Sequence, residues 1–274
     1  MDSSSKIISC INLYRLLPIS KLEQNVNAIS SLVYNDDSTL ENFLQKVDQP
    51  LIIQNERGGF ICCEYNRDGD SFRVPGTTDY IPPLTDGTFP NPKLLELEKA
   101  LNGIFRIYTN FYYSNTATSS VYCYEIDEDN PDEFVVAVLI RNKIEDTSSK
   151  GTNGIWEASN LVTVSIDPSE SEVSYDLISS VNVYLNASIQ TGNNSKLSVG
   201  GSMTKNIKEK HKYKDELDIQ FHTEKIGELI ENLETRIRDE IETIYFQKTT
   251  QIIGTARNNG DVQSTLSNLR NIMK

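Results

Sequence analysis

The sequence contains few of the residues on which most catalytic and metal sites depend. Its 274 residues include two histidines, His211 and His222, which lie 11 residues apart in different local patterns. Ser-His and Cys-His nucleophiles and most zinc sites need histidine close to other reactive side chains. We therefore expect a protein that is not an enzyme, with no catalytic residues, no bound metal and no cofactor.

Cysteine is scarce too, and its four occurrences are Cys10, Cys62, Cys63 and Cys123. An adjacent pair without a C-x-x-C spacing is not typical of a disulfide framework or a zinc site. Long hydrophobic runs are also missing, since the polar opening MDSSSKIISC soon reaches Arg15 and Pro18. We expect neither a signal peptide nor a stable membrane insertion, and therefore a cytoplasmic protein.

Positive charge is in deficit, because the formal net charge is −13 and the isoelectric point is near 4.7. Nucleic acids and anionic membrane surfaces attract basic proteins. The balance argues against either as the main partner, and we expect no nucleic-acid binding.

The strongest positive pattern lies at residues 222–253. Apolar residues recur there in steps of three and four, which is the period of an amphipathic helix, and they include Ile226, Ile230, Leu233, Ile237 and Ile241. About 32 residues at ~1.5 Å each give a helix of roughly 48 Å. Such a helix needs an equally long apolar surface to lie on.

Residues 1–48 carry three short helical patterns, and capping boxes open two of them at Ser20–Glu23 and Ser38–Glu41. Short connections between helices predict antiparallel neighbours, so we expect a helical stalk here. Residues 49–115 form a loop-rich segment followed by a helix over 93–113. Large apolar residues from Leu94 to Tyr112 predict that this helix is well buried.

The period changes to two in the region 116–221, which predicts strands. Candidates are Ser120–Ile126, Phe134–Ile140, Val162–Ile166, Val173–Leu185 and Lys196–Met203. No helical pattern separates them, so the sheet is expected to be antiparallel. The predicted fold class is therefore α+β: an N-terminal helical stalk, an antiparallel sheet covered by one long C-terminal helix, and a short amphipathic tail helix.

The tail, residues 254–274, has its own pattern. Gly254 is a candidate stop for the long helix, and Asp261 is a good N-cap for a last helix. Its apolar stripe consists of Val262, Leu266, Leu269 and Met273, with Arg270 and Lys274 beside it. About thirteen residues are too few for a stable lone helix in water. The tail is therefore expected either to dock on its own fold or to wait for a partner's groove.

One acidic turn invites a metal or catalytic reading. Asn66, Asp68 and Asp70 have the spacing that opens a calcium loop, but Ser71 and Thr77 stand where that loop needs Gly and Glu. We interpret the run as a structural turn in which Asp and Asn side chains cap backbone groups. An enzyme would rest on the Asp68 and Asp70 pair alone.

Several runs, taken together and in order, resemble the beta subunit of the heterodimeric F-actin capping protein. They include LYRLLP at 13–18, VDQPL at 47–51, CEYNRDGDSFR at 63–73, GGSMT at 200–204 and IYFQKT at 244–249. The third run is the most distinctive, and the resemblance extends over nearly the whole chain.

The resemblance implies an obligate heterodimer with an alpha subunit, in which the two sheets join and both long helices lie across them. It implies binding to the barbed end of the actin filament, where the dimer blocks subunit addition and loss, and a place in the actin cytoskeleton. Capping regulators are a further class of partner that the resemblance allows. The tail residues matching the family's actin contacts are Val262, Leu266, Leu269, Arg270, Met273 and Lys274. The residues expected at the dimer interface are Val173, Tyr175, Leu177, Val181, Val183, Leu185, Ile230, Leu233 and Ile237.

The chain departs from the family pattern at several points, and the second departure named here leaves an alternative open. Val74-Pro75-Gly76 stands where the family usually has Ser-Pro-Trp, and the link from Ile253 to the last helix is shorter than the family pattern. A shorter link changes the reach of the tail. The alternative is a dimerisation scaffold with weakened or lost capping that binds other partners.

Overall fold

The computed structural model describes residues 24, 27, 28, 31, 51–113, 116–127, 130, 132–145, 153–191, 193–213, 218–247 and 254. The predicted stalk and tail therefore lie outside the described residues, apart from single helical positions. The chain divides into two compact units, Met1–Glu234 and Thr235–Lys274. No helix among the described residues is long and apolar enough to cross a membrane.

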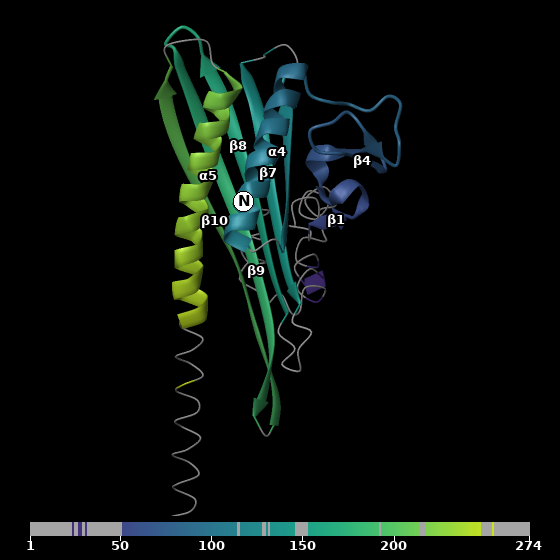
Figure 1. The fold of residues 1–274 in the computed structure, drawn as a ribbon. Coiled ribbons are helices and arrows are strands. Elements are labelled where there is room, and N and C mark those ends of the chain that lie inside the picture. The colour runs from purple at the N-terminus through teal and green to yellow at the C-terminus, as the bar shows by residue number, and fades with distance from the viewer. Residues whose placement is uncertain are drawn as a thin grey trace, which may run out of the picture. The chain divides into compact units, whose positions relative to one another are not determined.

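The first unit is built on an antiparallel sheet of five strands in the order β10-β9-β8-β7-β6, so each strand pairs with its neighbours in sequence (Figure 1). The strands are β6 (Ala117–Glu125), β7 (Glu133–Glu145), β8 (Asn153–Asp167), β9 (Glu172–Thr191) and β10 (Asn193–Lys212). The antiparallel sheet predicted from the alternating pattern is confirmed. The strands are longer than predicted, and β9 and β10 each have 20 residues.

Burial follows the two-residue period only in part of the sheet. In β8, Ala158, Val162 and Val164 are buried, whereas the residues directly before and after each of them are partly exposed. In β7, by contrast, every residue from Phe134 to Ile140 is buried. The β7 part of the sheet is therefore covered on both faces, and β8 is more open on one of them.

Helix α4 (Pro92–Tyr113) matches the helix predicted over 93–113. Asn91 caps its first turn, because its Oδ1 accepts a hydrogen bond from Leu94 N at 2.9 Å, and Pro92 occupies the first helical position. Its inner side is buried through Leu97, Leu101 and Phe105. This side packs against the sheet mainly at β6.

The prediction that α4 is well buried as a whole is wrong for its outer side. Ile107 is 69% exposed and Phe111 is 81% exposed, and Ile104 and Tyr112 are also exposed. Apolar residues occupy more of the helix circumference than the sheet can cover, so one stripe packs inward and the other faces outward.

Helix α5 (Ile219–Ile241) begins three residues before the predicted start at His222. The cause is Asp218, whose Oδ1 accepts a hydrogen bond from Phe221 N at 2.7 Å and so caps the first turn. Within the first unit, Ile226, Leu229, Ile230 and Leu233 are buried. This part of α5 lies on the same face of the sheet as α4 (Figure 1).

The second unit contains the end of α5, where Ile237 and Ile241 are buried. A π-helical turn, η4 (Glu242–Gln247), follows directly. Gly254 is itself helical. The prediction that Gly254 ends the long helix is therefore wrong at that residue.

The loop-rich segment 51–91 folds into two small sheets, with strand orders β1-β2 and β3-β4-β5. Its elements are β1 (Ile52–Gln54), η2 (Glu56–Gly58), β2 (Phe60–Cys62), η3 (Glu64–Asn66), β3 (Arg67–Asp68), β4 (Ser71–Arg73) and β5 (Tyr80–Ile81). Ile61 of β2 is fully buried in a cluster with Tyr122, Ala137 and Leu139. This cluster attaches the segment to β6 and β7.

Candidate interaction surfaces

A buried ion pair attaches segment 51–91 to helix α4. Arg73 donates two hydrogen bonds to the Glu98 carboxylate, at 2.7 and 2.8 Å, and the two side chains are 3% and 0% exposed. Glu98 also accepts the backbone N–H groups of Gly76 at 2.6 Å and Cys123 at 2.7 Å. Burial alone would lower the pKa of Arg73, but the hydrogen bonds and charge of Glu98 raise it above its usual value.

Asn66 extends this network into the distinctive 63–73 run. Its Oδ1 accepts a hydrogen bond from Cys63 N at 2.9 Å, and its Nδ2 donates to Arg73 O at 2.8 Å and to Tyr122 Oη at 2.9 Å. The Tyr122 hydroxyl then donates to Ile61 O at 2.6 Å. Every one of these groups is occupied by structural contacts, so the run holds the segment in place.

The Asp68 side chain has a structural role as well. Its Oδ2 accepts a hydrogen bond from Thr88 N at 3.1 Å. The next residue, Gly69, has a φ of +57°, which glycine adopts more readily than other residues. The structural turn predicted here is therefore observed, and Asp68 anchors the loop around Thr88 to it.

The outer edge of β6 is closed by side chains from α4. Asn102 Oδ1 accepts a hydrogen bond from Val121 N, and Asn102 Nδ2 donates to Val121 O, both at 2.9 Å. Glu98 binds the N–H of Cys123 on the same strand. Unpaired backbone groups on an edge strand attract other strands, and these contacts remove that attraction from the centre of β6.

The other end of the sheet is different. Among the strands that the structure describes, β10 has one neighbour, β9. Its outward lysines pair across this hairpin, with Lys208 Nζ 3.6 Å from Asp176 and Lys210 Nζ 3.5 Å from Glu172. These ion pairs join β10 to β9 through side chains that are exposed, apart from the partly buried Glu172.

Neutral polar groups hold the first part of α5 against β9. The Tyr175 hydroxyl and His222 Nδ1 are 2.9 Å apart and buried. Burial lowers the pKa of His222 to about 4, with an opposing contribution from the charge of Asp218. His222 is therefore neutral at physiological pH, as its buried position requires.

A second polar contact lies further along α5. The fully buried Glu234 accepts hydrogen bonds from Tyr108 Oη at 2.6 Å and from Asn160 Nδ2 at 2.8 Å. Tyr112 also donates to Glu231 at the exposed side of the same pair of helices. These contacts fix α5 beside α4 and over β8.

The residues expected at a dimer interface are mostly in the core of the single chain. Seven of the nine are at most 2% exposed: Val173, Tyr175, Leu177, Val181, Ile230, Leu233 and Ile237. Val183 and Leu185, further along β9, are partly exposed. The alternating apolar residues in this part of the sequence therefore belong mostly to the core of this chain. Of the nine, Val183 and Leu185 have side chains exposed enough to contact a partner.

The residues expected to contact actin all belong to the tail. Val262, Leu266, Leu269, Arg270, Met273 and Lys274 lie outside the described residues. Their role stays a prediction.

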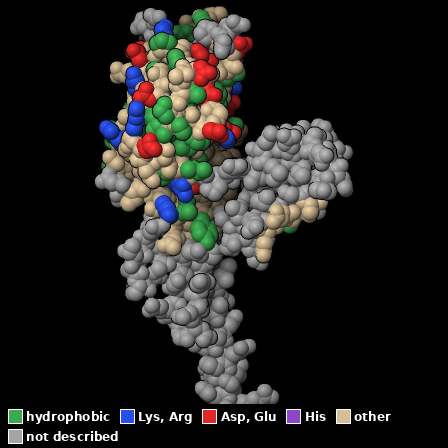
Figure 2. Space-filling model, turned by 90° about the vertical axis from the view of Figure 1, so that its right-hand side faces the viewer, with side chains coloured by type: hydrophobic (Ala, Val, Ile, Leu, Met, Phe, Trp, Pro, Cys, Tyr) green, Lys and Arg blue, Asp and Glu red, His purple; other side chains and the backbone are tan. Residues whose placement is uncertain are grey.

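Sequence reasoning missed two surfaces. One is the outer edge of β10, which has no second neighbour among the described strands, and the other is the exposed apolar stripe of α4 formed by Ile104, Ile107 and Phe111. The second could have been found, because apolar residues in α4 occupy neighbouring positions such as 104–105 and 111–112, more than one stripe needs. In the view of Figure 2, hydrophobic side chains reach the surface between acidic and basic ones. Exposed apolar patches often mark interaction sites.

Comparisons with known proteins agree with this architecture. The family described as "F-actin capping protein, beta subunit" matches residues 7–253. The F-actin-capping protein subunit beta of Dictyostelium discoideum is 34% identical over 93% of this chain and 90% of its own length. The corresponding subunit of Arabidopsis thaliana is 32% identical, covering 91% of this chain and 94% of its own length.

A solved structure shares the fold. It is the homodimeric actin capping protein alpha subunit from Plasmodium berghei, with a TM-score of 0.54 and 15% sequence identity. The match covers 93% of this chain and 96% of that one. With the family match over most of the chain and several relatives above 30% identity, the chain belongs to the F-actin capping protein beta subunit family.

Proposed function

We propose that this chain is the beta subunit of a heterodimeric capping protein, which binds the barbed end of actin filaments and blocks the addition and loss of subunits. The observation that carries the proposal is the family match over residues 7–253, which spans the sheet, both long helices and the distinctive 63–73 run. A family of filament-binding proteins also accounts for the lack of catalytic constellations, and the prediction that the chain is not an enzyme agrees with it.

The two edges of the sheet support a specific mode of pairing with an alpha subunit. Side chains of α4 already bind the outer backbone groups at the centre of β6, whereas β10 has a single neighbouring strand among those described. A second sheet is therefore expected to add at β10, through backbone hydrogen bonds along the strand.

Val183 and Leu185 fit this arrangement. They lie on β9 next to the β10 edge and keep partly exposed apolar surface. The buried residues Tyr175 and Ile230 contribute indirectly, because they fix β9 and α5 in the positions that a partner would meet. We expect the alpha subunit to cover the first pair and not the second.

The contact with actin is proposed to lie in the tail. Val262, Leu266, Leu269 and Met273 provide one apolar face, and Arg270 and Lys274 provide local positive charge in a chain whose net charge is −13. An amphipathic helix of this kind binds by laying its apolar face into a groove of the partner. Regulators that compete for capping would act on the same dimer.

The test is seeded actin elongation with the chain co-expressed with an alpha subunit. The intact pair should stop barbed-end growth, and deletion of residues 261–274 should raise the half-inhibitory concentration at least about tenfold. Leu266→Ser with Leu269→Ser should act in the same direction. Asn268→Ser with Asn271→Ser, on the polar face, is the matched control and should change little.

Two outcomes would contradict the proposal. Unchanged inhibition after the deletion would remove the tail from the mechanism. A soluble, intact dimer that leaves elongation unaffected would favour the scaffold alternative, for which the described structure offers no observation of its own.

A further inference from the structure

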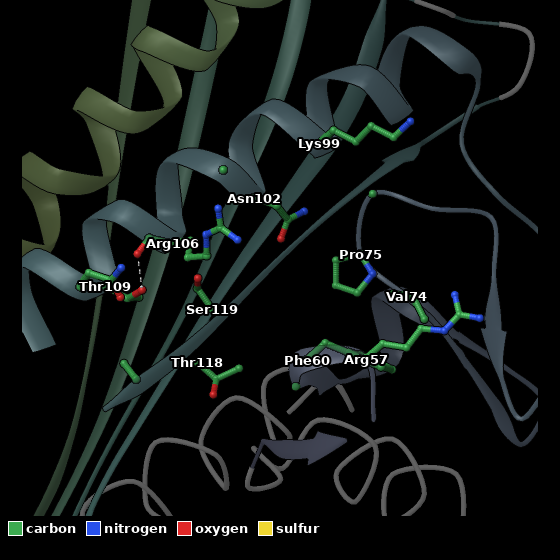
Figure 3. A pocket seen from close by; sticks show the side chains of 16 residues that line it. Arg57, Phe60, Val74, Pro75, Lys99, Asn102, Arg106, Thr109, Thr118 and Ser119 are labelled. Atoms are coloured by element: carbon green, nitrogen blue, oxygen red, sulfur yellow. Dashed lines mark hydrogen bonds between the residues drawn. The ribbon is translucent and has the colours of Figure 1, made fainter. Parts of the chain in front are cut away.

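We propose that the groove between α4, segment 56–76 and the start of β6 is a binding site for a compact polyanion, a ligand that carries two or more phosphate or carboxylate groups. The groove has a volume of about 520 Å³, which is the size of a small-molecule site. Figure 3 shows its walls, with Lys99, Asn102 and Arg106 on α4 at one side and Arg57, Phe60 and Pro75 at the other. This site is independent of the proposed capping function.

The charge of the groove is the first argument. Its lining, among the described residues, includes Arg57, Lys99 and Arg106 and no acidic side chain. The chain as a whole has 39 acidic and 26 basic residues, so a concave surface with cations alone runs against its average charge. Several cations around one hollow favour a ligand with several negative charges.

Two of these three cationic side chains are not used in ion pairs within the described part of the chain. Arg57 pairs with the exposed Asp79 at the rim. In the part of the chain that the structure describes, Lys99 and Arg106 take part in no ion pair. They lie seven residues apart on α4, two helical turns, so both project from the side of the helix that lines the groove.

Neutral donors are available beside them. Thr118 and Ser119 line the floor from β6, and Asn110 extends the wall of α4. No hydrogen bond joins these three side chains to any other described residue. Asn102, in contrast, is fully used by Val121 and the backbone of Glu98. Hydroxyl and amide donors next to a cation are suited to phosphate or carboxylate oxygens.

A glycine on the groove wall keeps the groove open, although packing within the chain does not require glycine at that position. Gly103 lies in the middle of α4, where glycine costs about 1 kcal/mol relative to alanine. A Cβ at Gly103 would meet no atom within 4 Å, so packing within the chain does not exclude a side chain there. Gly103 lies between Lys99 and Arg106 on the lining wall, so its missing side chain leaves room for a ligand between the two cations.

The opposite wall is shaped by a glycine of a different kind. Gly76 has a φ of +68°, and a Cβ there would lie 2.9 Å from Lys99 Cγ. The stem of Lys99 therefore packs on Gly76. Two walls from distant parts of the sequence thus present charge to one space.

The experiment is isothermal titration of the purified full chain, with its partner subunit if that is needed for solubility, using tripolyphosphate and then citrate at low ionic strength. We expect saturable binding with one site per chain, weakened by added salt. Gly103→Leu, which adds a large side chain on the groove wall, should abolish it while Gly103→Ala, whose Cβ would meet no atom within 4 Å, binds like the parent. Arg106→Glu should weaken binding at least about tenfold.

Lys93→Glu is the matched control, because it makes the same charge change on the same helix outside the groove, and it should leave the affinity within about twofold. Equal losses in Lys93→Glu and Arg106→Glu, or saturable binding unchanged by Gly103→Leu, would overturn the site. Absence of saturable binding of both probes would also overturn it.

A second measurement distinguishes a lipid headgroup from a soluble anion as the ligand. Phosphatidylcholine vesicles with and without phosphatidic acid are sedimented with the parent chain and with Gly103→Leu. Sedimentation that requires phosphatidic acid, is competed by tripolyphosphate and is lost in Gly103→Leu assigns the site to a lipid headgroup. Tripolyphosphate binding without sedimentation assigns it to a soluble anion.

Discussion

The two ends of the sheet are held in opposite ways. At the β6 end, a buried charged pair, Arg73 and Glu98, joins three elements and binds backbone groups of the strand. At the β9 and β10 end, the neutral pair Tyr175 and His222 is buried, and the lysines of the ion pairs are exposed. Side chains of α4 bind the outer backbone groups at the centre of β6, whereas β10 has one neighbouring strand among those that the structure describes.

This difference indicates which end of the sheet contributes more to the free energy of unfolding. A buried ion pair is stable only when every hydrogen-bonding position is filled, and Glu98 is filled by Arg73, Gly76 and Cys123. Exposed pairs such as Lys208 and Asp176 contribute little. We therefore expect the largest losses of stability from the β6 end.

The largest loss of stability is expected for Glu98→Ala. The change leaves the buried Arg73 charge without its carboxylate, with Thr77 O as a remaining acceptor, and it leaves the backbone N–H groups of Gly76 and Cys123 unpaired. The free energy of unfolding should fall by about 3–5 kcal/mol. Urea denaturation of the purified protein measures it, with Asp79→Ala as the control, which removes an exposed ion pair and should cost less than about 1 kcal/mol. Similar midpoints for the two variants would contradict the assignment of the β6 end as the anchored one.

Acid should act on the other end, through His222. Its folded pKa of about 4 lies below the unfolded value near 6.5, so between these pH values the unfolded chain binds a proton that the folded chain does not. Stability is therefore unaffected by His222 above about pH 6.5 and falls as the pH drops toward 4, by at most about 3 kcal/mol.

The measurement is urea unfolding at several pH values for the parent and for His222→Asn, whose amide can approach Tyr175 without titrating. Asp218 and His211, which lie near this site, are present in both proteins, so the difference between the two curves isolates His222. Parallel curves from pH 7 to pH 4 would show that His222 does not titrate in this way.

The smallest effect is expected on the surface of the β9–β10 hairpin. Lys208→Ala removes an ion pair whose side chains are 60% and 41% exposed. The free energy of unfolding should change by less than about 1 kcal/mol, and the change should shrink with added salt. A loss as large as that of Glu98→Ala would mean that this hairpin is anchored by its charges after all.

Local patterns in the sequence were sufficient for the main elements. The alternation from Val173 to Leu185 predicts β9 because a strand turns its side chains to opposite faces. The stripe through Ile226, Ile230 and Leu233 predicts α5 because a helix repeats every 3.6 residues. Errors arose at the ends of elements, where single contacts decide, such as the cap that Asp218 provides for α5.

The candidate sites were harder to predict, for a physical reason. Tyr175 is buried and Phe111 is exposed, although both are large apolar residues in periodic patterns. Such a pattern does not show which face packs within the chain and which is left for a partner. The groove lined by Arg57, Lys99 and Ser119 combines residues from three elements. Their convergence depends on how segment 51–91 folds back on α4.

The sequence by itself determined the family, the α+β class, the antiparallel sheet and the long helix, because periodicity and local motifs depend on neighbouring residues. Only the tertiary structure decided that Asn66, Arg73, Glu98 and Tyr122 form one network and that Lys99 and Arg106 line one groove beside Gly103. It also decided that α4 binds the outer edge of β6, whereas β10 has one neighbour among the described strands. The physical reason is that hydrogen bonds and charges act between atoms close in space, and residues far apart in sequence come close only when the chain has folded.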